Sequence, residues 1–498
     1  TKKKKRRKNK LKITINFTDL WSRLERVGPG TGAQTSVYVT KQGQKTKVLY
    51  TSNHERGRIL HVWQTVYEPF KRPKTTRLKG SRANSLQTMR EVKGKLYLLS
   101  FGRIYQVGSS LRNISVPHTF QKSFAIEFKQ MFYELWANLE ENFYNESFHG
   151  INWQTMKKKY EKFLPMVNNR NDLRILLNDM LGELNSSHMG FRSFGIEEFV
   201  FYESRTAATG VLFDQKNPYR VSGIVKRSPA DVTGKDIQVG DILVAVNGEK
   251  VDLAQNRVKY FTKSSRKSEI ELTFKRGNKE ITRRLHTTSA RGLRGLLYSE
   301  WEDRCKQIVD SAGKQKIAYV HMRNMGQGEL QRFLNYMTAE AYSKEGIIVD
   351  LRYNTGGNVH DNVLQFLSQK PYLKWKYREG AYTIQPNFTP AAKPIVLLIN
   401  EQSLSDAEMT ATGFKHLKLG KIIGTETYRW IIFTSGKTLV DGSFYRLPSW
   451  GCYTLDGKNI EKEGVKPDIF VQNTFKNRLE NQDPQLMRAI EEIQKQLK

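Results

Sequence analysis

The sequence predicts a multidomain α+β chain that ends in an α/β layer, and three observations support this fold class. The chain has 498 residues, which is too long for one hydrophobic core. Its first part, up to about residue 120, consists of short alternating segments between turn residues, as is typical of β structure. From Lys316 onward, short apolar runs alternate with amphipathic segments, and this order is typical of α/β layers.

The first predicted domain is a β-rich segment over residues 11–122, which follows a basic tail at residues 1–10. Strand-like runs such as residues 35–39 and 94–99 recur about every ten residues, as they do in propeller blades. A closed propeller needs at least four blades of ~40 residues each, so the segment is too short to close one. We therefore predict the end of a β-propeller or a small β-sandwich.

A helical domain is predicted for residues 123–200. Four apolar residues repeat at helical spacing in its first segment: Phe128, Phe132, Leu135 and Leu139. Two further helical segments, at residues 156–164 and 171–181, lead into a polar turn that contains Ser187 and His188.

Residues 201–290 form the next predicted domain. Alternating apolar residues at 242–246 indicate a strand, and the Asn-Gly pair that follows is typical of a tight hairpin turn. Residues 269–274 and 280–285 alternate in the same way and predict two further strands.

The last predicted domain, residues 291–498, carries the α/β pattern. Buried strands are expected at residues 317–320, 347–349 and 395–399, and helices at residues 328–342 and 362–367. An Asp-Pro pair at residues 483–484 supplies an N-cap and a first-turn proline for a helix at the carboxyl end.

Composition narrows the classes of function. The formal net charge is +33, and eight of the positive charges lie in residues 1–10. Such an excess can attract nucleic acid or acidic partners, but no nucleic-acid-binding signature is present, so we interpret it as a basic surface. No apolar run approaches the ~18 residues that span a bilayer. Cys305 and Cys452 form no disulfide framework, and the histidines form no metal-binding motif. We therefore expect no membrane span, metal or cofactor, and no nucleic-acid partner.

The strongest candidate for chemistry is the stretch from Asn400 to Glu408. It follows an apolar run at residues 394–399 and precedes a segment that can begin a helix. A serine at such a strand-to-helix turn points outward beside helix N-terminal amides, where a nucleophile and an oxyanion site can coexist. Ser405 is the preferred nucleophile and Ser403 is its rival, although either serine could instead be a helix N-cap.

A serine nucleophile needs a base. His188 is the best candidate, although a hydrogen-bonded interior histidine would fit the same pattern. Glu461 could orient His188 through Ser187, and Glu463 lies close enough in sequence to be mistaken for it.

The nucleophile also needs oxyanion donors. Gly356 and Gly357 follow the strand predicted at residues 346–350 and offer backbone amides, unless they only form a tight turn. The amide of Asp406, directly after Ser405, offers another.

Several of these stretches, in their order along the chain, resemble the tricorn protease family, which is related to the carboxyl-terminal processing proteases. The stretches are residues 182–188, 239–248, 350–357 and 400–408, with residues 461–468 behind the last. The likeness covers about residues 120–497. The second stretch is similar to a PDZ domain, a module that often holds peptide C-termini by strand addition.

The resemblance implies a serine peptidase with a crotonase-like α/β catalytic domain. Its substrates would be peptides or unfolded proteins, cleaved through a Ser-His-Ser-Glu tetrad and an acyl-enzyme. Ser405 would be the nucleophile and His188 the base. Ser187 would orient the histidine, and Glu461 would hold Ser187.

The same resemblance implies the oxyanion donors. Gly356 and Asp406 would supply the amides, with Gly357 as an adjacent candidate for the first. The family's larger members carry β-propellers upstream, which implies that residues 11–122 are the last part of one and that the chain is cut from a longer protein. We also expect a homo-oligomer, and the cytoplasm is favoured over the periplasm or secretion.

The sequence departs from the family's pattern in two places. The carboxyl-terminal processing relatives use a lysine base roughly 25 residues after the nucleophile, but residues 428–431 contain no lysine, and Lys421 and Lys437 are offset. This favours the tetrad over a Ser-Lys dyad. In addition, the region that would select basic P1 residues, residues 372–378, is basic and aromatic here. We therefore expect an acidic or apolar P1 preference.

Two other classes of function stay open at this point. One is a non-catalytic peptide-binding scaffold built on the PDZ module, in which the site has decayed. The other is an added role in binding nucleic acid through the basic tail at residues 1–10.

Overall fold

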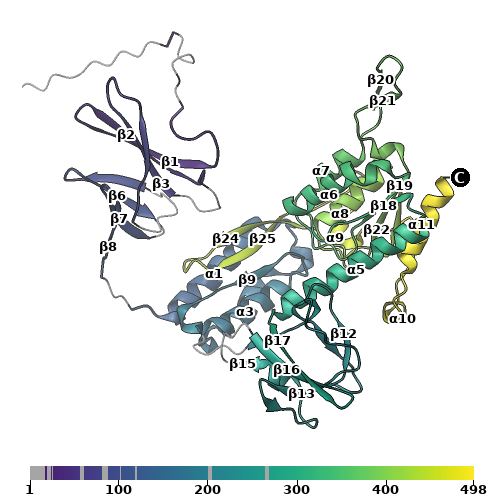
Figure 1. The fold of residues 1–498 in the computed structure, drawn as a ribbon. Coiled ribbons are helices and arrows are strands. Elements are labelled where there is room, and N and C mark those ends of the chain that lie inside the picture. Colours follow the sequence, from purple (N-terminus) through teal and green to yellow (C-terminus); the bar gives the residue numbers. More distant parts are fainter. Residues whose placement is uncertain are drawn as a thin grey trace, which may run out of the picture. The chain divides into compact units, whose positions relative to one another are not determined.

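The computed structural model describes residues 17–18, 24, 26–55, 61–80, 88–100, 102–117, 121–199, 205–263 and 269–497. The chain divides into two compact units, Thr1–Gln121 and Lys122–Lys498, and each is described by itself (Figure 1). The basic tail at residues 1–10 lies outside the described residues, so the role predicted for it stays a prediction.

The first unit contains two antiparallel sheets of four strands, in which each strand pairs with the next one along the chain. The strands of one sheet are β1 (Gln34–Gln42), β2 (Lys45–Ser52), β3 (His61–Tyr67) and β4 (Lys74–Arg77). Those of the other are β5 (Thr88–Val92), β6 (Lys95–Ser100), β7 (Arg103–Val107) and β8 (Leu111–Ile114). Buried apolar residues from both sheets form one cluster, which includes Leu49, Val62, Leu98 and Tyr105. The predicted β-rich character is therefore confirmed.

The second unit begins with three helices, α1 (Phe124–Asn142), α2 (Trp153–Glu161) and α3 (Arg170–Gly182). The residues predicted from helical spacing are buried along α1: Phe128, Phe132, Leu135 and Leu139. Asn152 and Asn169 cap α2 and α3, because their side chains accept hydrogen bonds from backbone N–H groups in the first turn.

A small antiparallel sheet connects this helical layer to the end of the chain. Its order is β24 (Phe433–Thr438), β25 (Phe444–Trp450) and β9 (Gly190–Arg192). Tyr445 and Leu447 of β25 pack into the core of the three helices. Because β9 begins two residues after His188, its pairing with β25 fixes the position of that histidine.

The next module is built from short strands around its own core. Its strands are β10 (Arg205–Thr206), β11 (Val211–Phe213), β12 (Val221–Ile224), β13 (Ile242–Val246), β14 (Glu249–Lys250), β15 (Thr262–Lys263), β16 (Glu269–Arg276) and β17 (Lys279–His286), with one short helix, α4 (Val258–Phe261). The predicted hairpin turn is confirmed, since Asn247 and Gly248 join β13 to β14 with positive φ angles of 50° and 80°.

Helix α5 (Ala290–Ala312) leads into a five-stranded parallel sheet. The sheet order is β18 (Ile317–His321), β19 (Gly346–Asp350), β22 (Ile395–Ile399), β23 (Lys421–Gly424) and β26 (Ile469–Phe470). Every residue of β18, β19 and β22 is buried, as expected of a parallel sheet that is covered on both faces.

Helices cover both faces of this sheet (Figure 1). On one face lie α6 (Gln327–Ala339), α7 (His360–Leu367) and α8 (Asp406–His416), and on the other lie α5 and α11 (Pro484–Gln496). Ile347 and Val349 pack on the first side and Ile348 on the second, which is the alternation of a strand. The short helices α9 (Ile460–Glu463) and α10 (Phe475–Leu479) complete the unit. The predicted α/β layer is confirmed.

Adjacent parallel strands bring their carboxyl ends to one edge of the sheet, where such folds bind ligands. The glycine turn follows β19 and the serine turn follows β22, and these two strands are neighbours. The two stretches singled out in the sequence therefore meet at this edge.

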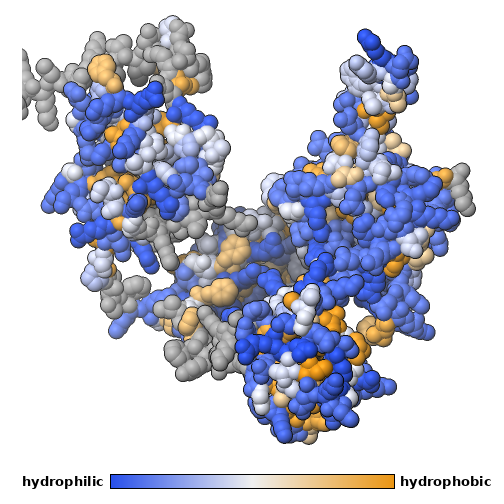
Figure 2. All heavy atoms as spheres, in the orientation of Figure 1, coloured by the Kyte–Doolittle hydropathy of each residue, from blue (hydrophilic) through white to orange (hydrophobic). Residues whose placement is uncertain are grey.

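A hairpin of β20 (Leu373–Lys376) and β21 (Tyr382–Gln385) projects from the α/β domain (Figure 1). All four residues of β20 are exposed. The face drawn in Figure 2 is mostly hydrophilic, with hydrophobic residues in separate patches. Among the described residues, no helix is long and apolar enough to cross a membrane.

Candidate active site

Ser405 lies in a strained turn between strand β22 and helix α8. Its backbone has φ 58° and ψ −120°, a region that non-glycine residues seldom occupy. The Glu408 carboxylate accepts a hydrogen bond from the Ser405 N–H at 3.1 Å and holds the turn. The Ser405 hydroxyl is hydrogen bonded to Nε2 of His188 at 3.1 Å. The turn therefore presents Ser405 to a histidine from a distant part of the chain.

Ser403, the rival nucleophile, has a structural role. Its side chain is fully buried. Its hydroxyl donates to the Leu351 carbonyl oxygen at 2.8 Å and accepts from the Asn400 N–H at 3.0 Å. These bonds tie the serine turn to the glycine turn and leave Ser403 no access to a substrate.

His188 lies in the loop between α3 and β9, also with a positive φ of 58°. Burial of the imidazole, followed by the nearby Arg446 guanidinium, lowers the pKa of His188 to about 4. The imidazole is therefore neutral near pH 7. Trp430 lies against its edge, with ring centroids 5.5 Å apart.

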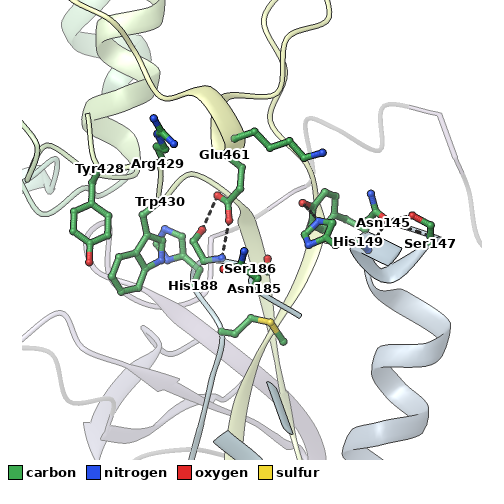
Figure 3. A pocket seen from close by; sticks show the side chains of 14 residues that line it. Asn145, Ser147, His149, Asn185, Ser186, His188, Tyr428, Arg429, Trp430 and Glu461 are labelled. Atoms are coloured by element: carbon green, nitrogen blue, oxygen red, sulfur yellow. Dashed lines mark hydrogen bonds between the residues drawn. The ribbon is translucent and has the colours of Figure 1, made fainter. Parts of the chain in front are cut away.

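Glu461 holds Ser187 at two points. One carboxylate oxygen accepts from the Ser187 N–H at 2.6 Å and the other from the Ser187 hydroxyl at 2.8 Å (Figure 3). The second oxygen also accepts from the Ile431 N–H at 3.1 Å. Among the described residues, no hydrogen bond joins the Ser187 hydroxyl to the imidazole. The link from Glu461 to His188 therefore runs through the backbone of the Ser187-His188 turn.

Glu463 is exposed and lies beside a different cavity, which has a volume of about 930 Å³. It makes no contact with Ser187. Glu461, the residue preferred from the sequence, and its neighbour Glu463 therefore have different surroundings.

The glycine turn lies directly against the serine turn. Gly356 has φ +76°, and a Cβ atom there would come within 2.6 Å of the Ser405 Cβ. A Cβ on Gly357 would come within 2.1 Å of the Met325 carbonyl oxygen. Only glycine fits at either position, since both backbones approach their neighbours too closely for a side chain.

The two glycine amides differ in their partners. The Gly356 N–H already donates to the Asn354 side chain at 2.8 Å. Within the described part of the chain, neither the Gly357 N–H nor the Asp406 N–H donates a hydrogen bond. The unused amides beside Ser405 are therefore those of Gly357 and Asp406.

Asp406 also connects two helix N-termini through its buried carboxylate. One oxygen accepts from the backbone N–H groups of Val359, at 2.7 Å, and His360, at 3.1 Å. The other oxygen pairs with Nδ1 of His360, and this contact raises the pKa of His360. The start of α7 is thereby fixed to the start of α8, next to the candidate oxyanion amides.

Glu408 and Arg446 are site residues that the sequence analysis did not identify. The Glu408 carboxylate also accepts from the Trp430 N–H at 2.8 Å and the Thr427 hydroxyl at 2.6 Å, and so fixes the loop around His188. The sequence does contain a pattern that could have identified Glu408, since a serine followed three residues later by glutamate is typical of a helix start. No sequence pattern around Arg446 indicates a role at this site, because Arg446 contacts His188 only as a result of the pairing between β25 and β9.

A cavity of about 900 Å³ opens beside His188 and Glu461 (Figure 3). Its wall combines aromatic and polar side chains, including those of Tyr144, His149, Tyr428, Arg429 and Trp430. None of residues 372–378, which we expected to shape P1 selection, lines this cavity. They belong to the projecting hairpin instead.

Other catalytic chemistries find little support in the structure. In the part of the chain that the structure describes, no three His, Cys, Asp or Glu side chains are arranged to hold a metal ion. Burial raises the pKa of Cys305 to about 12 and also raises that of Cys452, so neither thiol is prone to ionise. Lys437 donates to Asn138 at 2.8 Å, and Lys421 lies exposed on β23, so neither provides a base for Ser405.

Comparison with protein families finds three matches in the second unit. Residues 124–182 match the tricorn protease C1 domain, residues 208–287 match the PDZ domain and residues 316–471 match peptidase family S41.

Curated relatives carry related names. The chain is 29% identical over 383 residues to a putative tricorn-like protease C-terminal subunit of Sulfurisphaera tokodaii, which covers 74% of this chain and 44% of that protein. It is 27% identical over 399 residues to the tricorn protease of Thermoplasma acidophilum, with 75% and 35% covered. A probable CtpA-like serine protease of Staphylococcus aureus is 25% identical over 268 residues, with 50% and 49% covered.

Among solved structures, the tricorn protease shares the fold. The TM-score is 0.73 at 23% identity, over 92% of this chain and 46% of that one. The chain thus spans less than half the length of these tricorn proteins. The chain is similar to the tricorn proteases, and it matches the tricorn protease C1 domain, the PDZ domain and peptidase family S41, in that order along the sequence.

Proposed function

We propose that the chain hydrolyses peptide bonds in peptides or unfolded proteins, through Ser405 as nucleophile and His188 as base. The observation that carries this proposal is the 3.1 Å hydrogen bond between Ser405 Oγ and His188 Nε2, two residues 217 positions apart. If Ser405 were only a helix cap and His188 only an interior histidine, neither role would require a hydrogen bond between them next to the unused amides of Gly357 and Asp406. This arrangement supports the assignment of a nucleophile, a base and an oxyanion site.

In the proposed mechanism, Nε2 of His188 takes the Ser405 proton as Oγ attacks the substrate carbonyl carbon. The carbonyl oxygen becomes an oxyanion and accepts hydrogen bonds from the Asp406 amide and from a glycine amide. We favour Gly357 over Gly356 for the second donor, because the Gly356 amide already binds Asn354. One such donor typically contributes about 2.7–4 kcal/mol to lowering the barrier.

The tetrahedral intermediate then collapses. The imidazolium returns its proton to the leaving amine, and Ser405 stays acylated. A water molecule, activated by His188 in the same way, hydrolyses the ester. Ser187 and Glu461 act in this proposal by holding the backbone of His188, whose positive φ needs support.

The experiment is a comparison of the wild type with Ser405→Ala on a fluorescein-labelled unfolded protein and a mixture of quenched peptides. Hydrolysis should be lost while the variant stays folded, because the substitution removes a single hydroxyl at the start of α8, and the unfolding temperature is measured in parallel to show this. Full hydrolysis by the variant would reject the assignment. A wild type that binds peptides through its PDZ module without cleaving them would favour the scaffold function.

We also propose that the chain divides into domains at residues 11–122, 123–200, 201–290 and 291–498. The division between the two compact units and the limits of the three family matches support these boundaries. The two four-stranded meanders have the form of propeller blades, which supports an incomplete propeller. A crotonase-like catalytic domain is compatible with the helix-covered parallel sheet.

Two further proposals rest on likeness and chemistry. By likeness to the tricorn fold we propose a homo-oligomer, which sedimentation velocity would test. Cys305 and Cys452 are both free thiols, as suits the reducing environment of the cytoplasm, our proposed compartment.

A further inference from the structure

Arg446 contacts the candidate base in a way that sets its tautomer. Its Nη1 lies 2.8 Å from Nδ1 of His188, and a guanidinium can only donate hydrogen bonds. Nδ1 must therefore accept, so a neutral His188 carries its proton on Nε2. That Nε2–H faces the Ser405 hydroxyl at 3.1 Å. An imidazole in this tautomer cannot take the Ser405 proton, so the site is held in a resting state.

A second arginine, Arg192, lies beside Arg446 in the β25–β9 pairing. In the β25–β9 pairing, Arg192 is opposite Phe444 and Arg446 is opposite Gly190, so the two arginines are diagonal neighbours on one face. Both are exposed. No carboxylate among the described residues forms an ion pair with either guanidinium. Two adjacent unpaired guanidinium groups form a site for an anion, and arginine is suited to hold a carboxylate with two hydrogen bonds.

The imidazole has another partner available when Arg446 moves. Burial and then Arg446 lower the pKa of His188, while a hydrogen bond to the Trp430 backbone acts in the opposite direction. A backbone group that favours the imidazolium must be an acceptor, which is the carbonyl oxygen. When Arg446 withdraws from Nδ1, that nitrogen can carry the proton of the neutral imidazole, and this is the tautomer that a general base needs.

We propose that Arg446 and Arg192 bind a substrate carboxylate next to the scissile bond, and that this binding draws Arg446 away from His188 and releases the catalytic tautomer. The neutral imidazole gives its Nε2 proton to solvent water and takes one from water at Nδ1, which Arg446 no longer contacts. Nε2 then accepts the Ser405 proton. No proton is gained or lost overall, and the enzyme selects acidic peptides. This inference rests on the proposed peptidase function.

The carboxylate could belong to an acidic side chain or to the peptide's own C-terminus. Three quenched peptides with one mapped cleavage site separate these sources. The first has Asp beside the scissile bond and an amidated end. The second has Asn in its place. The third keeps Asn but ends in a free carboxylate directly after the scissile residue pair. For the wild type, kcat/KM should be about tenfold or more higher for a carboxylate peptide than for the neutral one, as expected for a charge-assisted hydrogen bond.

The variant that tests the mechanism is Arg446→Met, with Arg446→Lys as the conservative change. Arg446→Met should cleave the neutral peptide several-fold faster than the wild type, because Nδ1 is released, and should lose the preference for the carboxylate. Arg446→Lys should keep the preference. Arg332→Met is the matched control, because Arg332 on α6 is also an exposed arginine but pairs with Glu302 and Glu329 away from this cavity. It should leave the preference unchanged.

Labelling of Ser405 with an uncharged fluorophosphonate gives a second readout. Arg446→Met should be labelled several-fold faster than the wild type. In a plot of the labelling rate against pH, the fall at low pH should move to higher pH, because a cation near the imidazole has been removed. The inference would be overturned if the ratios of kcat/KM among the three peptides and the labelling rate were the same in the wild type and in Arg446→Met. The peptidase function would still stand in that case. If no protein is labelled or active, both fail.

Discussion

Replacing Glu461 by Gln tests how His188, the proposed catalytic base, is held in position. The carboxylate accepts three hydrogen bonds, from the Ser187 N–H, the Ser187 hydroxyl and the Ile431 N–H. A glutamine side chain offers one acceptor oxygen in place of two and turns N–H donors toward the remaining groups. At least one of the three donors therefore loses its acceptor.

The size of the effect follows from these contacts. A hydrogen bond to a charged group contributes about 1.5–3 kcal/mol. If that loss falls on the positioning of His188 in the transition state, kcat/KM drops about tenfold to a hundredfold. The assay is hydrolysis of a quenched peptide, with the unfolding temperature measured in parallel to confirm that the variant is folded.

Glu463→Gln provides the matched control. Glu463 lies two residues away on the same short helix, but it is exposed and does not touch Ser187. Its replacement should change kcat/KM by less than about twofold, as is usual for surface positions. Glu461→Gln with nearly full activity, or an equal loss in both variants, would refute the role given to Glu461.

Three further predictions concern the pH profile, the serine pair and the core. With a neutral peptide, kcat/KM should fall only as the pH drops through about 4, the pKa of His188, because imidazolium cannot accept a proton; an acid limb near the ordinary value of about 6.5 would contradict this. Ser403→Ala should lower the free energy of unfolding by about 1–3 kcal/mol in urea titrations, because it leaves the buried Leu351 carbonyl and Asn400 amide without a partner, but fluorophosphonate labelling should persist. Arg352→Met should destabilise by about 3–5 kcal/mol, since it leaves the carboxylates of Asp350 and Asp483 without their buried partner; a change below about 1 kcal/mol would count against that pairing.

Local patterns in the sequence predicted the elements that carry the site. The buried runs of β19 and β22, with a glycine turn after one and a serine turn after the other, follow from apolar composition and chain length. Because parallel neighbours end at the same edge, the two turns could be expected to meet. The sequence favoured Ser405 over Ser403 as the nucleophile, but the hydrogen bonds that bury the Ser403 hydroxyl depend on contacts that local patterns do not specify.

Contacts between distant segments were beyond the reach of local patterns. His188 meets Ser405 because β9 pairs with β25, and nothing in the spacing of either strand specifies that pairing. Arg446 arrives at the imidazole by the same route. The choice between the Gly356 and Gly357 amides depends on the Asn354 side chain, which occupies the first.

The basic and aromatic stretch at residues 372–378 illustrates a different limit. The resemblance to the tricorn family suggested a role in P1 selection, but the chain forms a hairpin that projects from the domain. Local sequence patterns do not determine in which direction such a hairpin points. The positive charge beside the His188 imidazole comes instead from Arg446.

The most direct test of the peptidase assignment is the stoichiometry and position of fluorophosphonate labelling, read by intact mass and peptide mapping. We predict one adduct per chain on Ser405, absent in Ser405→Ala, strongly slowed in His188→Ala and retained in Ser403→Ala. The absence of an adduct in the folded wild-type protein, or an adduct on another serine, would contradict the assignment.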